Sequence, residues 1–283
     1  MILVTGSTGN VGGEVVQQLA RARERVRALV RKADAPAFAG GVDSVVGDLD
    51  RPESLAAALA GVRAVFLLGG YRDMPSVLTQ IRDARVERVV LLSSRSVLLD
   101  DPSNAIVKMW LDSENAVRAS GVAWTLLRPS GFASNALRWL PQLRAGDVVR
   151  APFAGAPIAA IDPADIAAVA VAALTTEQHA GRSYALSGPE ALLPEQQVQI
   201  LAKVLGRTLR FEAQPDEEAL AELTKSAPPG FADAFSRFFV KGEFDDAQLL
   251  PSVQELTGRT PRTFEHWARA HVGVFVNPLG ARA

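Results

Sequence analysis

Short apolar runs alternate, along the first half of the chain, with longer segments in which apolar residues recur every three or four positions. The runs predict β-strands at 2–5, 25–30, 43–46, 63–68, 88–93 and 123–127. The stretches 64–68 and 89–92 are apolar without alternation, which is typical of strands covered on both faces. The intervening segments predict helices, the first with Val11, Val15 and Leu19 on one face. This order predicts repeated βα units on a parallel sheet.

The regular alternation weakens after residue 129. We predict helices near 133–144, from Pro163, and at 194–205, 216–226, 231–240, 246–257 and 261–271. Strands are predicted near 157–161, 182–186 and 208–212. The loss of regular order indicates a smaller lobe that is interleaved with the main sheet.

The composition is that of an ordinary globular protein, since 48% of the 283 residues are hydrophobic and 22% are charged. A formal net charge of −1 gives no protein-wide reason to expect nucleic acid or a membrane as partner. The lack of cysteine excludes disulfides, thiolate metal sites and cysteine nucleophiles, and the three histidines have no metal-like spacing. Residues 1–4 lead directly into a glycine turn instead of an apolar secretion segment, so we expect a cytoplasmic protein.

The first strand is followed at once by a glycine-rich turn that opens the first helix. The turn reads Gly6-Ser7-Thr8-Gly9-Asn10-Val11-Gly12, a GxxGxxG spacing one residue longer than the dinucleotide fingerprint. Glycine permits a tight turn and close approach of a pyrophosphate, and the helix start supplies free N–H groups. We predict a dinucleotide pyrophosphate bound by Gly6, Ser7, Thr8, Gly9, Asn10 and Val11. The alternative is an ordinary surface turn.

The end of the second strand indicates which dinucleotide is bound. An NAD site has an acidic residue about 20 positions after the glycines, where it accepts hydrogen bonds from the ribose. This chain has Arg31 there, and a guanidinium matches a phosphate, so we predict that Arg31 holds the 2′-phosphate of NADP(H). The alternative is a solvated surface arginine.

The third and fourth strands add residues for the adenosine end of the cofactor. Asp48, after the third strand, is placed to accept a hydrogen bond from the adenine amino group, or else to cap a turn. Leu67, Leu68 and Gly69 are placed to line the adenine and ribose cleft.

Several segments together resemble the NmrA-like group of the atypical short-chain dehydrogenase/reductase superfamily. They are Thr5 to Gly12, Arg31, Gly47-Asp48, Ser93-Ser94, the segment 120–132 that includes Arg128-Pro129-Ser130-Gly131-Phe132, and Ile161 to Ala167. The match spans nearly the whole chain. The resemblance implies that Pro129, Ser130, Gly131 and Phe132 border the nicotinamide, with Asn135 close by. Ser93 and Ser94 end a strand beneath it, although a serine at a strand end can equally be a structural hydrogen-bonding residue. The resemblance also implies one of two functions, an NADPH-dependent quinone or dye reductase or an NADP-binding redox sensor.

The main branch of that superfamily carries a Tyr-x-x-x-Lys pair on the helix after the fifth strand, and this chain lacks it. The two tyrosines, Tyr71 and Tyr184, lie outside that helix. Asn104 and Lys108 have the spacing of the pair, but an amide is no acid; Lys108 could contact the ribose or lie on a solvated face. Hydride addition to a quinone gives a phenolate with a conjugate-acid pKa of about 10, which solvent can protonate. The missing tyrosine therefore disfavours ketone reduction more than reduction of quinone-like acceptors.

We accordingly expect an NADPH-dependent reductase of quinone-like or conjugated small-molecule acceptors. Trp110, Phe132 and Trp139 are candidate walls of an apolar acceptor pocket, although each could instead be core. The alternative function is a non-catalytic, NADP(H)-responsive regulator. A homodimer is expected only on general grounds, and no metal site is expected.

The expected architecture is a Rossmann-type, doubly wound parallel α/β sheet with a smaller interleaved C-terminal α/β lobe. Residues 1–150, with 157–186 returning to them, are assigned to the NADP(H)-binding domain, and 187–283 to a mostly helical substrate lobe.

Overall fold

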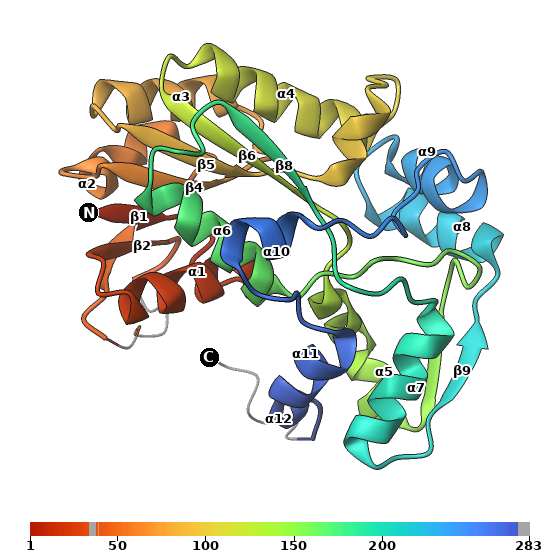
Figure 1. The fold of residues 1–283 in the computed structure, drawn as a ribbon. Coiled ribbons are helices and arrows are strands. Elements are labelled where there is room, and N and C mark those ends of the chain that lie inside the picture. Colours follow the sequence, from red (N-terminus) through yellow and green to blue (C-terminus); the bar gives the residue numbers. More distant parts are fainter. Residues whose placement is uncertain (34–37, 39, 277–283) are drawn as a thin grey trace.

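A seven-stranded parallel sheet forms the centre of the computed structural model, which describes residues 1–33, 38 and 40–276 (Figure 1). The strand order is β3-β2-β1-β4-β5-β6-β8, and every adjacent pair is parallel. The strands are β1 (Ile2–Val4), β2 (Val26–Val30), β3 (Asp43–Val46), β4 (Ala64–Leu68), β5 (Arg88–Leu92), β6 (Ala123–Pro129) and β8 (Arg182–Leu186). This is the Rossmann-type α/β fold predicted from the apolar runs.

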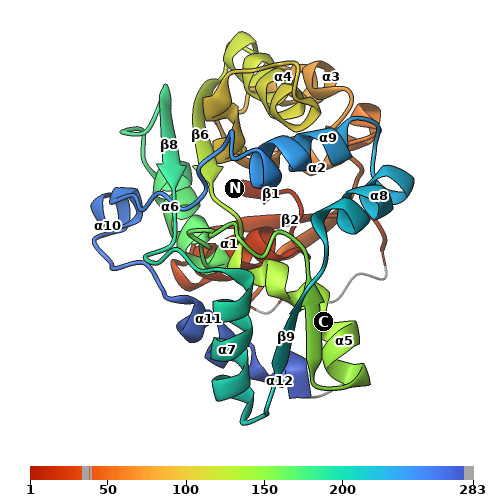
Figure 2. The same ribbon diagram turned by 90° about the vertical axis from the view of Figure 1, so that its right-hand side faces the viewer.

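Helices cover both faces of this sheet, as the unbroken apolar strands require (Figures 1 and 2). One face carries α1 (Asn10–Arg21) and α6 (Pro163–Thr175), which pack against each other. The other carries the 3-10 turn η1 (Pro52–Leu55), α2 (Ala56–Leu59), α3 (Met74–Asp83) and α4 (Ala105–Ala119), the last preceded by the 3-10 turn η2 (Arg95–Leu99). The predicted stripe of α1 is confirmed, because Val11, Val15 and Leu19 are all buried.

Residues after β6 build a second hydrophobic cluster beside the sheet. A two-stranded parallel sheet pairs β7 (Val148–Ala151) with β9 (Arg210–Ala213). Around it lie η3 (Ala133–Trp139), α5 (Leu140–Ala145), α7 (Pro194–Leu205), α11 (Phe264–Ala270) and α12 (Val272–Val276). The remaining helices are α8 (Asp216–Ser226), α9 (Phe231–Phe235) with the π-helical turn η4 (Ser236–Val240), and α10 (Ser252–Thr257), which packs on α6.

Two predicted elements near the end of β6 are wrong. The segment 157–161 is extended but forms only isolated bridges, Phe132 with Ile161 and Ile158 with Leu192, because its backbone bonds to several different segments. The predicted helix 246–257 begins only at Ser252. Residues 246–250 instead run as a strap, in which the Asp246 carbonyl accepts from the Ala159 N–H and the Leu250 N–H donates to Ser187 Oγ.

Other differences concern boundaries and helix type. The segment 133–144 begins as a 3-10 helix before α5, and 231–240 changes from α to π, distinctions that apolar periodicity does not resolve. The short strand β7 was not predicted, and its partner β9 begins two residues later than the predicted 208. Such short strands carry little periodic signal.

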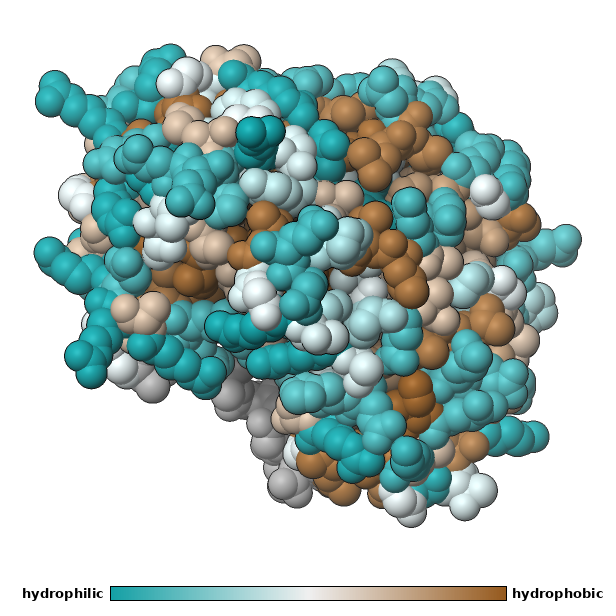
Figure 3. All heavy atoms as spheres, viewed as in Figure 1, coloured by the Kyte–Doolittle hydropathy of each residue, from teal (hydrophilic) through white to brown (hydrophobic). Residues whose placement is uncertain are grey.

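The strand order reverses between β1 and β4, which in an open α/β sheet leaves a crevice at the carboxyl ends of the strands. The predicted site residues at the ends of β1, β2, β4, β5 and β6 therefore share one edge of the sheet. Figure 3 shows a largely hydrophilic face on which hydrophobic side chains gather in patches. No helix within residues 1–33 and 40–276 is both long and apolar enough to cross a membrane.

Candidate active site

The glycine turn at the end of β1 is shaped by close contacts that only glycine permits. Gly6 has a φ of +59°, and a Cβ there would lie 2.4 Å from Leu68 Cδ1. A Cβ on Gly12 would lie 2.2 Å from the Gly6 carbonyl oxygen, so α1 packs directly on the turn. Gly9 is different, because it is exposed and an added Cβ would meet only that oxygen, at 3.2 Å. Because Gly9 has no side chain, the space beside it opens to solvent and not to the protein core.

The start of α1 fits an anionic group. No side chain caps this helix end, and its first turn holds no acidic residue, so its free N–H groups and dipole favour a negative charge. Thr8, Gly9 and Asn10 are exposed beside it. Ser7 and Val11 are buried, and Ser7 Oγ donates to the Leu29 carbonyl at 2.8 Å. Ser7 and Val11 could therefore face a pyrophosphate only through their backbone atoms.

Arg31 follows β2 directly and is exposed at the same edge of the sheet. Asp48 is half-buried nearby, and its Oδ1 accepts from the Asp50 N–H at 3.0 Å while its Oδ2 lies 3.7 Å from Arg51 Nε. The structure therefore gives Asp48 the turn-capping contact, and its contact with adenine stays a prediction.

Tyr71 lies close enough to the predicted adenosine residues to feel their charges. Burial, and then the carboxylates of Asp50 and Asp48, raise the pKa of Tyr71, while the positive charge of Arg31 lowers it. The second tyrosine, Tyr184, pairs with His179 Nδ1 at 2.9 Å. Neither phenol is placed to replace the missing catalytic acid.

The three residues predicted after β4 have different environments. Leu67 is fully buried between the sheet and the helices α2 and α3, so its side chain does not line the cleft as predicted. Leu68 is half-buried and lies against Gly6, and its N–H donates to Thr5 Oγ1. Gly69 has room for no side chain, because a Cβ would lie 2.9 Å from Trp110 Cζ3.

A buried carboxylate ties the ends of β5 and β6 together. Glu114, on α4, has no exposed surface and accepts hydrogen bonds from Ser93 Oγ at 2.7 Å, from Arg128 at 2.8 and 2.6 Å, and from Arg118 at 2.8 Å. Desolvation raises the pKa of Glu114, but the hydrogen bonds from Arg128 and Ser93 and both cationic charges outweigh it, so the pKa is lowered overall. The Ser93 hydroxyl therefore donates its hydrogen bond to Glu114.

The segment Pro129–Phe132 leaves the sheet held by hydrogen bonds on both sides. The Ser130 N–H donates to the Leu186 carbonyl and its hydroxyl to the Ala159 carbonyl. The Gly131 N–H donates to Asp246 Oδ2 at 2.9 Å, from the strap 246–250. A Cβ at Gly131 would lie 2.9 Å from Ile158 Cγ2, so this glycine permits close packing under the strap.

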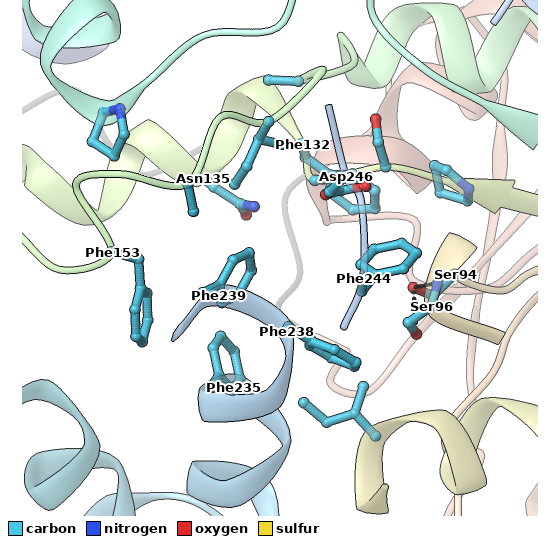
Figure 4. A pocket seen from close by; sticks show the side chains of 18 of the residues that line it. Ser94, Ser96, Phe132, Asn135, Phe153, Phe235, Phe238, Phe239, Phe244 and Asp246 are labelled. Atoms are coloured by element: carbon cyan, nitrogen blue, oxygen red, sulfur yellow. Dashed lines mark hydrogen bonds between the residues drawn. The ribbon is translucent and has the colours of Figure 1, made fainter. Parts of the chain in front are cut away.

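This segment borders a cavity of about 490 Å³. All three predicted wall residues, Trp110, Phe132 and Trp139, line it. The opposite wall is aromatic, and the rings of Phe153 and Phe239 stack with centroids 5.0 Å apart (Figure 4). Further lining residues include Ser94, Ser96, Asn135, Arg138, Phe235, Phe238, Phe244 and Asp246.

Asp246 and Arg95 form a buried pair behind this cavity. Arg95 is 2% exposed and donates to the carbonyls of Asp245 and Gln248, and its Nη1 lies 3.6 Å from Asp246 Oδ1. Burial raises the pKa of Asp246 to about 6, although the Gly131 N–H and the charge of Arg95 oppose this. The pair anchors the strap over the end of β6.

The positions of the missing catalytic pair have other roles in the structure. Asn104 is buried and caps α4, its Oδ1 accepting from the N–H groups of Ile106 and Val107. Lys108 is exposed, pairs with Asp112 at 2.6 Å and does not line the cavity. The solvated-face alternative for Lys108 therefore matches the structure.

Phe153, the phenylalanines at 235–244 and Asp246 were not predicted as site residues. One signal was present, because five of the 12 phenylalanines lie within residues 231–244. This is an unusual concentration of large aromatic side chains on one short helical segment.

Comparisons with known proteins find a matching family model and relatives that align with nearly the whole chain. A family model described as NAD(P)H-binding matches residues 6–177. The (4-alkanoyl-5-oxo-2,5-dihydrofuran-3-yl)methyl phosphate reductase of Streptomyces griseus is 43% identical, with 97% of this chain and 99% of the relative covered. The NAD(P)H azoreductase of Xenophilus azovorans is 34% identical over the same shares. Among solved structures, an NADPH-dependent quinone oxidoreductase of Escherichia coli is 25% identical with a TM-score of 0.75, covering 96% of this chain and 99% of its own.

Proposed function

Since the chain belongs to the NAD(P)H-binding family, we propose that it is an NADPH-dependent reductase of quinone-like or conjugated acceptors. The chain is an NAD(P)H-dependent oxidoreductase. The observation that carries the finer proposal is the aromatic cavity at the ends of β5 and β6, in a site without a phenol acid. The relatives' names support it, because a dihydrofuranone, an azo group and a quinone are all conjugated acceptors.

Each part of the cofactor has proposed partners in the chain. The turn from Gly6 to Val11 would hold the pyrophosphate at the start of α1, and Arg31 the 2′-phosphate. Asp48, Leu68 and Gly69 would border the adenosine, and Pro129–Phe132, with the end of β5 at Ser93, would border the nicotinamide. When bound, NADPH supplies the hydride.

The chain's own residues orient the acceptor and limit water. The phenylalanine rings of the cavity provide a flat, apolar surface for a conjugated ring. Fixed geometry of this kind accelerates a transfer by removing orientational entropy. A phenolate product needs no strong acid, because its conjugate acid has a pKa of about 10.

We expect NADPH to bind at least about tenfold more tightly than NADH, which corresponds to about 1.4 kcal/mol. The reason is that Arg31 would face a doubly charged phosphate, while the position directly after β2 holds no acidic residue to bind the ribose diol. Isothermal titration of both cofactors measures the preference, and Arg31→Ala should remove it. Arg21→Ala, which deletes an exposed charge at the far end of α1, is the matched control. A preference that survives in Arg31→Ala would remove this residue from its role.

The acceptor class is tested by turnover. With NADPH, purified protein should reduce 1,4-naphthoquinone faster than cyclohexanone, an unactivated ketone. Phe132→Ala should lower kcat by about tenfold while the NADPH Kd changes by less than about twofold, since its ring borders the acceptor cavity. Phe211→Ala, a half-buried phenylalanine of β9 outside the cavity, is the control.

If quinones, azo dyes and enones all give no turnover above the protein-free rate, the reductase proposal fails. The NADP(H)-responsive regulator then becomes the better hypothesis. It requires a partner that binds differently with and without NADPH, because a ligand shifts an equilibrium only through differential affinity.

A further inference from the structure

One cation on the cavity wall has no anionic partner among the residues that the structure describes. Arg138, in the last turn of η3, lines the cavity next to Trp139. Its Nε–H donates to the Asn135 carbonyl at 2.9 Å, which orients the guanidinium. Its two terminal nitrogens make no hydrogen bond to the part of the chain that the structure describes, and no carboxylate there lies within 4.0 Å. The outer edge of the guanidinium is thus available to a ligand.

The charge balance of the cavity makes this cation distinctive. The charged residues on its wall are Arg138 and Asp246. Asp246 is already engaged by the Gly131 N–H and lies beside Arg95. Arg138 is exposed at the cavity, and desolvation by the protein around it lowers the pKa of its guanidinium. An anion that enters the cavity would meet a cation that no described carboxylate within 4.0 Å neutralises.

We propose that the acceptor carries an anionic group, a phosphate, carboxylate or sulfonate, which Arg138 binds through its two terminal nitrogens. A guanidinium presents parallel N–H donors that match two oxygens of such a group. The conjugated part of the acceptor lies against the phenylalanine wall formed by Phe153, Phe235 and Phe239. This inference rests on the proposed function, because it assigns the cavity to the acceptor.

The same arrangement disfavours cationic acceptors. With Asp246 paired to Arg95, a positive ligand would meet the charge of Arg138, which no described carboxylate within 4.0 Å compensates. The site thus selects by charge as well as by shape.

The test compares 1,4-naphthoquinone-2-sulfonate with 1,4-naphthoquinone on the full-length protein saturated with oxidised NADP. Binding is measured directly, by titration calorimetry, and steady-state KM is measured with NADPH. We expect the sulfonate to bind at least about tenfold more tightly than the neutral quinone. Arg138→Met should remove that difference, leaving the neutral quinone and NADPH within about twofold of wild type.

Two controls separate the possible explanations. Arg144→Met deletes an exposed charge on α5 outside the cavity and should keep the sulfonate preference. Arg138→Lys keeps the charge but loses the planar fork, so part of the preference should remain. The ratio of the KM values for the two quinones is compared between variants. This comparison cancels the effect of their different reduction potentials, which are the same for every variant.

Equal binding of the two quinones by wild type overturns the inference. So does an Arg138→Met variant that keeps the preference, or one that weakens NADPH binding as much as sulfonate binding, because the residue would then serve the cofactor. Absence of turnover with both quinones overturns the proposed function, while the calorimetric ratio still decides the anion site.

Discussion

Replacing Gly9 by valine should weaken NADPH binding at least about 100-fold, or about 2.7 kcal/mol, and leave the protein folded. Gly9 is exposed and its φ of −91° and ψ of 175° suit any residue, so the backbone tolerates a side chain. The added valine would fill the outward space where the cofactor pyrophosphate is proposed to lie. Titration calorimetry measures the loss, and circular dichroism checks the fold.

Gly12→Ala is the contrasting variant at the other end of the turn. Its Cβ would lie 2.2 Å from the Gly6 carbonyl oxygen, so the start of α1 must move away from the turn. We expect Gly12→Ala to lower the free energy of unfolding as well as cofactor affinity. If Gly9→Val binds NADPH like wild type, the turn is not the cofactor cradle.

Glu114→Gln should lower the free energy of unfolding by about 3–5 kcal/mol. The substitution leaves Arg128, which is mostly buried, without its carboxylate and replaces an acceptor of four hydrogen bonds by an amide. Urea unfolding at neutral pH measures the change. Because the pKa of Glu114 is lowered in the folded state, its contribution is present above the unfolded-state pKa and is lost as the pH falls through the folded value.

The matched control is Glu177→Gln. Glu177 pairs with Arg88 at 3.4 Å but is 90% exposed, so the same chemical change should cost less than about 1 kcal/mol. Similar losses in the two variants would mean that the buried network around Glu114 does not hold the ends of β5 and β6 together.

The parts that were predictable are those encoded over short stretches of chain. The glycine turn occupies Gly6 to Gly12, and its spacing reflects local steric needs that the structure displays atom by atom. The seven strands of the main sheet were predicted to within two residues, and continuous apolar runs such as 64–68 are what burial on both faces requires.

The phenylalanine wall of the cavity and Asp246 could not be predicted, because they meet the rest of the site only through long-range contacts. Phe153 stacks on Phe239, 86 positions later, and no periodicity links the two. Asp246 was assigned to a helix, but its carboxylate accepts from Gly131, 115 residues away. The role of Asn104 was equally hidden, since its spacing to Lys108 mimics the catalytic pair while its side chain caps α4.

The position of the strap 246–250 in the sequence also determines when it becomes available during synthesis. The last strand of the main sheet ends at Leu186, 60 residues before Asp246. A ribosome therefore releases the whole sheet, with the glycine turn, well before the segment that covers Gly131 and neutralises Arg95. Contacts of such sequence separation form late, because loop closure must precede them. The nascent chain thus completes the glycine turn and the main sheet before the strap that packs over Gly131.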